Sequence, residues 1–154
     1  MGNGRAANAR PINLNMKSRP PLWFYNQSAV IPYRIIHEEI EVLLITSRRR
    51  KHWIIPKGVI DLGSSAGESA AREAYEEAGI KGRLSDSPIG EYQYKKWGGT
   101  CTVKVFTLEV QTVLETWPEA STRQRQWLTV KDAAQTVEEP ELQRLILKVP
   151  DMRL

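Results

Sequence analysis

Residues 58–80 read GVIDLGSSAGESAAREAYEEAGI, and the most informative pattern of the chain lies within them. Their second half predicts a helix over residues 65–78, because Ser65 and Glu68 have the spacing of a capping box and Gly79 is a natural helix end. Small residues recur every four positions along this segment, at Ala70, Ala74 and Ala78. A helix with such a stripe can lie close against a β-sheet.

The predicted helix carries three acidic side chains on one side. Glu76 and Glu77 follow Glu73 by three and four positions, so the three carboxylates project close together and repel one another. A divalent cation relieves that repulsion, and Mg²⁺ prefers carboxylate and phosphate oxygens as ligands. Arg72 precedes Glu76 by four positions, which predicts an ion pair that holds this carboxylate. The alternative interpretation is a solvated acidic face.

The same stretch resembles the Nudix box. That pattern is Gly, five residues, Glu, seven residues, Arg-Glu, an aliphatic residue, any residue, Glu-Glu, any residue, Gly and an aliphatic residue. The matching positions are Gly58, Arg72, Glu73, Glu76, Glu77, Gly79 and Ile80, with the small Ala74 at the first aliphatic position. Ser64 stands where the pattern has its first glutamate. In the family this glutamate supports the loop-to-helix junction and the arginine. Glu68, one turn before Arg72, is a candidate replacement, and the capping box is its alternative role.

The resemblance extends over roughly residues 27–147. Residues 47–56, 113–117 and 123–127 are similar to the corresponding parts of diphosphoinositol polyphosphate phosphohydrolases, which hydrolyse inositol pyrophosphates and dinucleoside polyphosphates. The resemblance implies an α/β protein of the α+β type with the Nudix fold, an αβα sandwich around a mixed central β-sheet. It also implies attack of a metal-activated water on phosphorus, with Mg²⁺ as the cofactor and Mn²⁺ as an alternative.

The resemblance and the chemistry together give a set of candidate metal and catalytic residues. The expected metal ligands are Glu73, Glu76 and Glu77, and the family adds the Gly58 carbonyl. Arg72 is counted with the catalytic groups. The proton acceptor is left open between Glu76 and Glu91, and Glu91 has the plainer alternative of a solvated glutamate on a strand.

Cations near the predicted metal site are the candidates for binding substrate phosphates. The basic block before residue 52 supplies Arg48, Arg49 and Arg50, the Pro-Lys-Gly turn supplies Lys57, and a later segment supplies Arg123 and Arg125. The two later arginines share one face if their segment is extended. An exposed basic surface is the alternative for each group. Tyr92, Tyr94 and Trp97 could stack on a nucleobase, with core packing as the alternative for one of them.

Other patterns indicate how the chain is organised. Strands are expected at residues 28–34, 40–47, 53–55, 89–97, 100–112 and 125–129, with a loop over residues 57–64. A helical turn is expected at residues 131–136 and a closing helix at residues 140–148. Residues 1–22 contain four cations and no acid, which predicts a flexible basic leader, and residues 23–154 are expected to form a single Nudix domain.

Composition narrows the class of protein. The 154 residues include one cysteine, so an internal disulfide is ruled out and a reducing cytoplasm is the expected location. No apolar run is long enough for a membrane span. The expected substrate is a polyphosphorylated small molecule, namely a diphosphoinositol polyphosphate or a diadenosine polyphosphate. Nucleic acid is not an expected partner except as RNA 5′ ends, and either a monomer or a homodimer is expected. The alternatives are RNA 5′-pyrophosphohydrolysis, a catalytically weakened Nudix-fold regulator, and a nucleic-acid-binding domain.

Overall fold

The structure is a computed structural model, and it describes residues 22–49, 51–96 and 98–152. The predicted basic leader lies outside these ranges except for Leu22, which begins a short 3₁₀ turn, η1 (Leu22–Tyr25). The predictions made for Arg50 and Trp97 also fall outside the described residues.

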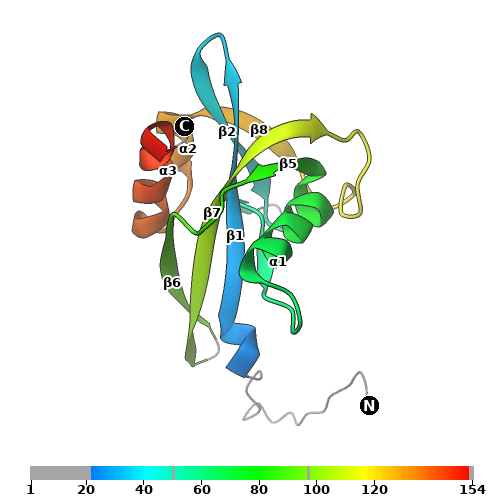
Figure 1. Cartoon of the computed structure of the whole chain (residues 1–154), viewed down its shortest axis with the longest axis vertical. Helices are drawn as coiled ribbons and strands as arrows, with labels where there is room; N and C mark the ends of the chain where they lie inside the picture. Colours follow the sequence, from blue (N-terminus) through cyan, green and yellow to red (C-terminus); the bar gives the residue numbers. More distant parts are fainter. Residues whose placement is uncertain (1–21, 50, 97, 153–154) are drawn as a thin grey trace.

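An eight-stranded mixed sheet forms the middle of the molecule (Figure 1). The strands are β1 (Asn26–Ile36), β2 (Glu39–Thr46), β3 (Trp53–Ile54), β4 (Lys57–Val59), β5 (Ile80–Leu84), β6 (Gly90–Lys96), β7 (Gly99–Val113) and β8 (Arg125–Thr129). At the centre β1 and β7 run parallel, and the other pairs are antiparallel. The β1–β2 hairpin closes through His37 and Glu38, both with positive φ, as a two-residue turn requires to match the twist of its strands.

Helices cover both faces of the sheet (Figure 1). On one face lies α1 (Ala66–Glu73), which continues into a π-helical turn, η2 (Ala74–Ala78). On the other face lie α2 (Val130–Thr136) and α3 (Pro140–Met152). Each face has its own apolar core, one containing the Ala70, Ala74 and Ala78 stripe and the other containing buried residues of α2 and α3. The predicted αβα sandwich with a mixed sheet is therefore confirmed.

Two short strands depart from the sequence prediction. The predicted loop over residues 57–64 begins with β4, which pairs with β1. The segment after Gly79 forms β5, which pairs with β7 although three of its five residues are exposed. Residues 80–84 alternate too weakly and contain Gly82, so the hydrophobic pattern could not predict this strand. Within the described chain, no helix combines the length and the apolar character that a bilayer span needs.

Candidate active site

The start of α1 is fixed by its own side chains. The Ser65 Oγ accepts a hydrogen bond from the Glu68 backbone N–H at 3.0 Å, and the Glu68 carboxylate accepts one from the Ser65 N–H at 2.9 Å. The predicted capping box is thus confirmed. The ion-pair partner of Arg72 is Asp61 rather than Glu68, so the prediction that Glu68 replaces the missing box glutamate is wrong.

Arg72 is paired with a residue of the preceding loop. Its guanidinium forms an ion pair with the Asp61 carboxylate and donates a weak hydrogen bond to the Ser69 Oγ at 3.5 Å. Among the described residues Arg72 makes no contact with Glu76, so that predicted ion pair is wrong. The reason is geometric, because a helical side chain points back toward the N-terminus and Glu76 lies one turn farther on.

Strand β4 lies directly beneath the acidic side of the helix. A Cβ atom on Gly58 would overlap the Glu73 carboxyl group, so only glycine lets the strand and this carboxylate approach so closely. One residue earlier, the Lys57 backbone N–H donates a hydrogen bond to Glu77 Oε1 at 3.2 Å. The two contacts join β4 to two successive turns of the helix. They bring Gly58, Glu73 and Glu77 together as the sequence predicted.

Burial and mutual repulsion govern the charge of the glutamates. Burial, followed by the charge of Glu77, raises the pKa of Glu73 to about 8. Burial also raises the pKa of Glu77, although the Arg123 charge and the Lys57 N–H oppose it. The two carboxylates therefore disfavour each other's charged form. Glu76 is less buried than Glu77.

This donor set fits a hard divalent cation. Among the described residues no three acidic, histidine or cysteine side chains converge as a preformed metal cage. Glu73, Glu77, the less buried Glu76 and a backbone carbonyl are nevertheless oxygen ligands of the kind that Mg²⁺ takes. The Ser28 Oγ, opposite Gly58 in the sheet, is buried and has no hydrogen-bond partner among the described residues.

A row of four residues crosses the sheet at this level. Gly58 of β4 faces Ser28 of β1, Ser28 faces Lys104 of β7, and Lys104 faces Glu91 of β6. Paired residues project to the same side, which here is the side of α1. Glu91, a predicted proton acceptor, is therefore on the correct face. It lies three strands from Gly58, on the order of 14 Å at about 4.8 Å per strand. The sequence prediction missed Ser28 and Lys104, although Lys104 stands out as a charge between the apolar Val103 and Val105.

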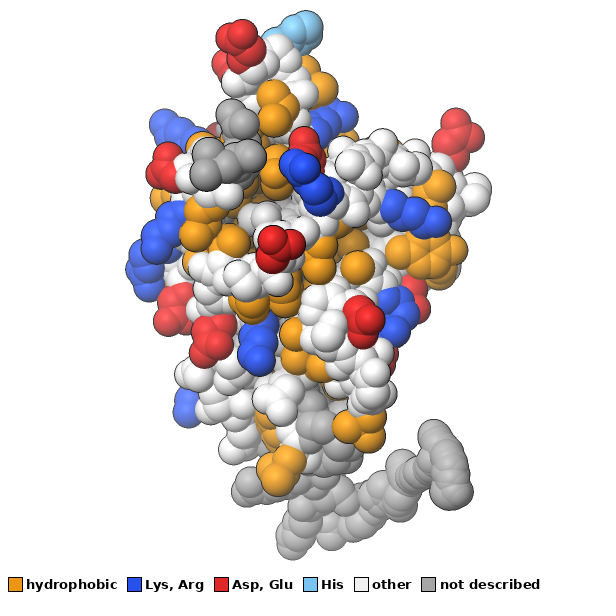
Figure 2. Space-filling view, viewed as in Figure 1, with side chains coloured by type: hydrophobic (Ala, Val, Ile, Leu, Met, Phe, Trp, Pro, Cys, Tyr) orange, Lys and Arg blue, Asp and Glu red, His pale blue; other side chains and the backbone are white. Residues whose placement is uncertain are grey.

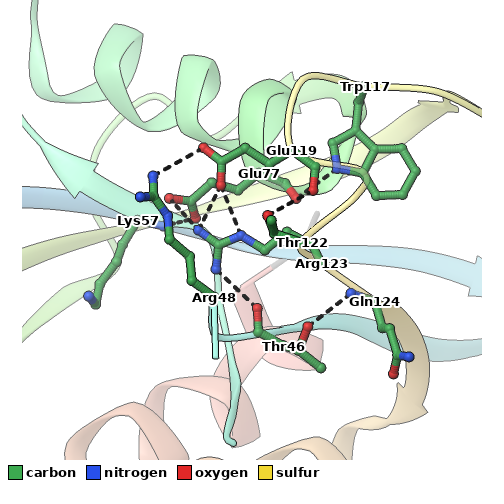
Figure 3. Close-up of polar contacts among 9 residues, drawn as sticks. All are labelled: Thr46, Arg48, Lys57, Glu77, Trp117, Glu119, Thr122, Arg123 and Gln124. Atoms are coloured by element: carbon green, nitrogen blue, oxygen red, sulfur yellow. Dashed lines mark hydrogen bonds and ion pairs between the residues drawn. The ribbon is translucent and has the colours of Figure 1, made fainter. Parts of the chain in front are cut away.

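Arg123 contacts the helical turn that carries Glu77 (Figure 3). Its side chain is 4% exposed, and its guanidinium contacts Glu77 Oε2 at 3.3 Å and Glu119 Oε1 at 2.9 Å. It also donates to the Thr46 carbonyl at 3.0 Å, which ties it to the end of β2. All these partners are protein groups, so the contacts give Arg123 the role of orienting Glu77. The prediction that it binds substrate phosphate stays a prediction.

The connection between β7 and β8, residues 114–124, clamps the π-helical turn. The Trp117 indole N–H donates to the Glu77 carbonyl at 2.9 Å, and the Glu119 N–H donates to the Glu76 carbonyl at 3.1 Å. Arg125 stacks on the Trp117 ring at 3.8 Å from its centroid and donates to the Ala78 carbonyl at 3.0 Å. Burial lowers the pKa of Arg125. Its predicted phosphate contact also stays a prediction.

The other predicted cations lie at different distances from the acidic pair. Arg48 is exposed and approaches Glu119 at 3.6 Å, so it belongs to the network that ends on Glu77 (Figure 3). Arg49 is exposed on the same loop. The Lys57 ammonium lies over the Tyr94 ring at 5.0 Å, on the sheet face opposite α1, and burial lowers its pKa. Its side chain therefore points away from Glu73.

The aromatic side chains of β6 face the α3 side of the sheet. Tyr92 is buried in the core there, which favours the core-packing interpretation for this residue. The Tyr94 hydroxyl donates to the Gln27 side chain at 2.9 Å.

Known proteins match this sequence and fold. The sequence model of the NUDIX domain matches residues 26–149, and the chain belongs to the Nudix family. The mitochondrial Nudix hydrolase 13 of Arabidopsis thaliana is 36% identical over 128 residues, which cover 69% of this chain and 63% of that protein. Diphosphoinositol polyphosphate phosphohydrolase 2 of Rattus norvegicus is 34% identical, over 75% of this chain and 64% of that protein. The chain thus spans less than two thirds of the length of both relatives.

Solved structures agree with the family assignment. The crystal structure of the C. elegans Ap4A hydrolase superposes with a TM-score of 0.67 and 25% identity, over 82% of this chain and 96% of that one. The predicted membership of the Nudix family is therefore confirmed.

Proposed function

We propose that this protein is a Mg²⁺-dependent pyrophosphohydrolase that cuts phosphoanhydride bonds in a polyphosphorylated small molecule. The observation that supports it most is the close approach of the Glu73 carboxylate to Gly58, beside the buried carboxylate of Glu77. Two neighbouring carboxylates repel each other and add no stability of their own, whereas a metal enzyme needs such a pair.

The proposed mechanism assigns roles to the residues around this contact. Glu73, Glu76, Glu77 and the Gly58 carbonyl would hold the divalent ion, which lowers the pKa of a bound water and neutralises phosphate charge. Arg123 and the Lys57 N–H fix the rotamer of Glu77. Glu76 is less buried, and its side chain has no hydrogen-bond or ion-pair partner among the described residues. It is our candidate to accept the proton of the attacking water. Glu91 is the second candidate, on the same face of the sheet.

The substrate phosphates would lie along the polar row on the α1 face. A pocket of about 380 Å³ meets this row at Lys104, and its wall also includes Asp61, Ser64 and Thr102 but none of the three glutamates. That volume is within the range of small-molecule sites, roughly 300–1,000 Å³. Lys104 is the cation of this pocket and lies two strands from Gly58. We propose that Lys104 binds a phosphate next to the scissile bond, and that Arg48 binds phosphates farther out.

Two substrate classes are proposed, diadenosine polyphosphates and diphosphoinositol polyphosphates. The first is supported by the similarity to an Ap4A hydrolase and the second by the similarity to a diphosphoinositol polyphosphate phosphohydrolase. RNA 5′ ends stay the alternative substrate. On the face shown in Figure 2, Lys and Arg are interspersed with Asp and Glu, a pattern that does not favour binding along a polynucleotide. The Arg72–Asp61 pair argues against the weakened regulator, because Arg72 is anchored despite Ser64.

A substrate panel tests this proposal. Ap4A, a diphosphoinositol polyphosphate and a 5′-triphosphorylated RNA are incubated with the full chain, with Mg²⁺ or with EDTA, and the products are resolved by ion-exchange chromatography. We expect turnover of at least one of the small molecules with Mg²⁺ and none with EDTA. Turnover that persists in EDTA, or binding of all three without turnover, would defeat the proposal.

The expected cytoplasmic location, the single-domain organisation and the choice between monomer and homodimer stay predictions. Imaging of a tagged chain in its native cells tests the location, and light scattering after gel filtration tests the oligomeric state.

A further inference from the structure

Arg72, the arginine of the Nudix box, is paired with Asp61 of the preceding loop and not with a glutamate at the position that the family pattern specifies. Ser64 occupies the pattern's glutamate position, and the Asp61 carboxylate forms the ion pair with Arg72. We propose that Asp61 is a positioning residue that replaces the absent glutamate. It holds the segment of residues 58–61 against α1, the helix that carries the proposed metal ligand Glu73. The inference rests on the proposed function for its catalytic consequence, but its geometric part stands alone.

Asp61 is attached to the helix by both its backbone and its side chain. Its N–H donates to the buried Ser69 Oγ at 3.1 Å, and its carboxylate contacts the guanidinium of Arg72, which itself approaches the same Ser69 Oγ. In the chain Asp61 follows Gly58 by three residues and Arg72 precedes Glu73 by one. The loop and the helix are therefore joined at two neighbouring points, by the Asp61–Arg72 ion pair and by the Gly58–Glu73 contact.

Neither of the other nearby side chains can take this role. The carboxylate of Glu68 is used by the Ser65 N–H in the capping box. The Ser64 hydroxyl carries no charge and cannot form an ion pair with a guanidinium. However, the Ser64 N–H donates to the Asp61 carbonyl at 3.0 Å, so a tight turn brings positions 61 and 64 together. A glutamate at position 64 can reach the same arginine from this neighbouring place.

The exposure of the pair indicates that it orients rather than stabilises. Arg72 and Asp61 keep 36% and 52% of their side-chain surface exposed, and ion pairs at this level of exposure add little to folding stability. Removing a group that positions a metal ligand without binding the metal itself nevertheless lowers metal affinity substantially. A variant that lacks the Asp61 carboxylate should therefore fold normally and bind metal poorly.

The test compares Asp61→Ala, Ser64→Glu and the double variant Asp61→Ala/Ser64→Glu with the wild type. Asp86→Ala is the matched control, because Asp86 is another exposed loop aspartate close to the start of α1. Four quantities are measured: Mn²⁺ affinity by EPR, kcat and KM for Ap4A with Mg²⁺, and the hydrogen-exchange rate of the residue 61 amide. For Asp61→Ala we expect Mn²⁺ affinity to fall on the order of tenfold. We also expect a lower kcat, little change in KM and faster exchange.

The double variant tests whether a carboxylate at position 64 can take over the role of the one at position 61. We expect Ser64→Glu to restore Mn²⁺ affinity and the exchange rate toward wild type in the Asp61→Ala background and to change these two quantities little alone. Because Ser64 lines the proposed phosphate pocket, kcat and KM of the double variant are compared with those of Ser64→Glu. Unchanged Mn²⁺ affinity and exchange in Asp61→Ala would overturn the inference, and so would a double variant no better than the single one. If wild type hydrolyses nothing, the proposed function fails, while the exchange data still decide the role of Asp61.

Discussion

Glu73, Glu76 and Glu77 are close in sequence, but their surroundings give them different tasks. Glu77 is 7% exposed and held by Arg123 and the Lys57 N–H, whereas Glu73 is more exposed and lies against Gly58. Glu76 keeps more contact with solvent. This exposure is the reason for proposing Glu76 as the proton acceptor.

Replacing Glu76 by Gln should remove activity without disturbing the fold. The amide keeps the size of the side chain but is a poorer metal ligand and cannot accept the proton, so we expect kcat to fall by a factor on the order of 10²–10⁴. Turnover of Ap4A and the urea unfolding curve measure the two effects. Glu39→Gln, at the exposed start of β2, is the control and should keep full activity. Activity of Glu76→Gln within a small factor of wild type would remove Glu76 from the mechanism.

Metal-free protein should lose stability as the pH rises through neutrality. The folded state holds the pKa of Glu73 at about 8, above the ordinary value of 4.5, so between these values it binds a proton that the unfolded chain has released. The free energy of unfolding therefore falls as the pH rises across this window. Urea unfolding in EDTA at several pH values measures the slope for wild type and Glu73→Gln. We expect the variant to lose this component, and equal slopes would contradict the assignment.

Individual partners in the site were the hardest feature to predict from sequence. The acidic residues and Gly58 were predicted because they lie within one short motif. Asp61 was not predicted, because helical spacing pointed to Glu68 as the partner of Arg72. In the structure Glu68 belongs to the capping box instead. Ser28 and Lys104 reach the site through the β1–β7 pairing, which joins segments far apart in the chain.

At the scale of elements, the proposed metal site depends on the helical turn that follows α1, because this turn positions Glu76 and Glu77. The helix widens into the π-helical turn where it carries Glu76 and Glu77, and π-helical turns of this kind are frequent at functional sites. Gly79 then adopts a left-handed conformation, and the Trp117 ring fills the space where a Cβ atom would lie. The hydrophobic period of residues 65–78 predicted a helix but could not show this widening, because it depends on contacts with residues 114–124.

Breaking the Arg123 contacts should destabilise the protein strongly. Arg123→Met leaves the Glu77 carboxylate buried without its cation, and removing one partner of a buried ion pair costs roughly 3–5 kcal/mol. Arg83→Met is the matched control, because Arg83 and Glu109 form an exposed pair that should contribute about 0–1 kcal/mol. Urea unfolding gives both values. A cost for Arg123→Met no larger than that for the control would show that the network does not restrain Glu77.

At the scale of the whole molecule, the sandwich followed from the sequence because each layer has a clear pattern. The small-residue helix, the apolar strands and the closing helix were all predicted within a few residues of their observed bounds. The short strands β4 and β5 were not, since their pairing depends on partners elsewhere in the sheet.

Bound metal should stabilise the entire fold, because the proposed ligands come from both β4 and the helix. At a free Mg²⁺ concentration of about 100 times Kd, the linkage relation gives roughly 2.7 kcal/mol. For a domain of this size that corresponds to a rise in Tm on the order of 5–10 °C. Thermal unfolding with Mg²⁺ or EDTA measures it. Glu76→Gln should show a smaller rise and Glu39→Gln the full one, whereas no rise in wild type would argue against a magnesium site.

The connection of residues 114–124 has a practical consequence for engineering. Surface connections usually tolerate inserted residues, but this one grips the backbone of Glu76 and Glu77 through Glu119 and Trp117. A peptide tag inserted into this connection would displace these backbone contacts, and with them the Glu76 and Glu77 carboxylates. The tip of the β1–β2 hairpin, by contrast, is the safer place to graft a label or a tether.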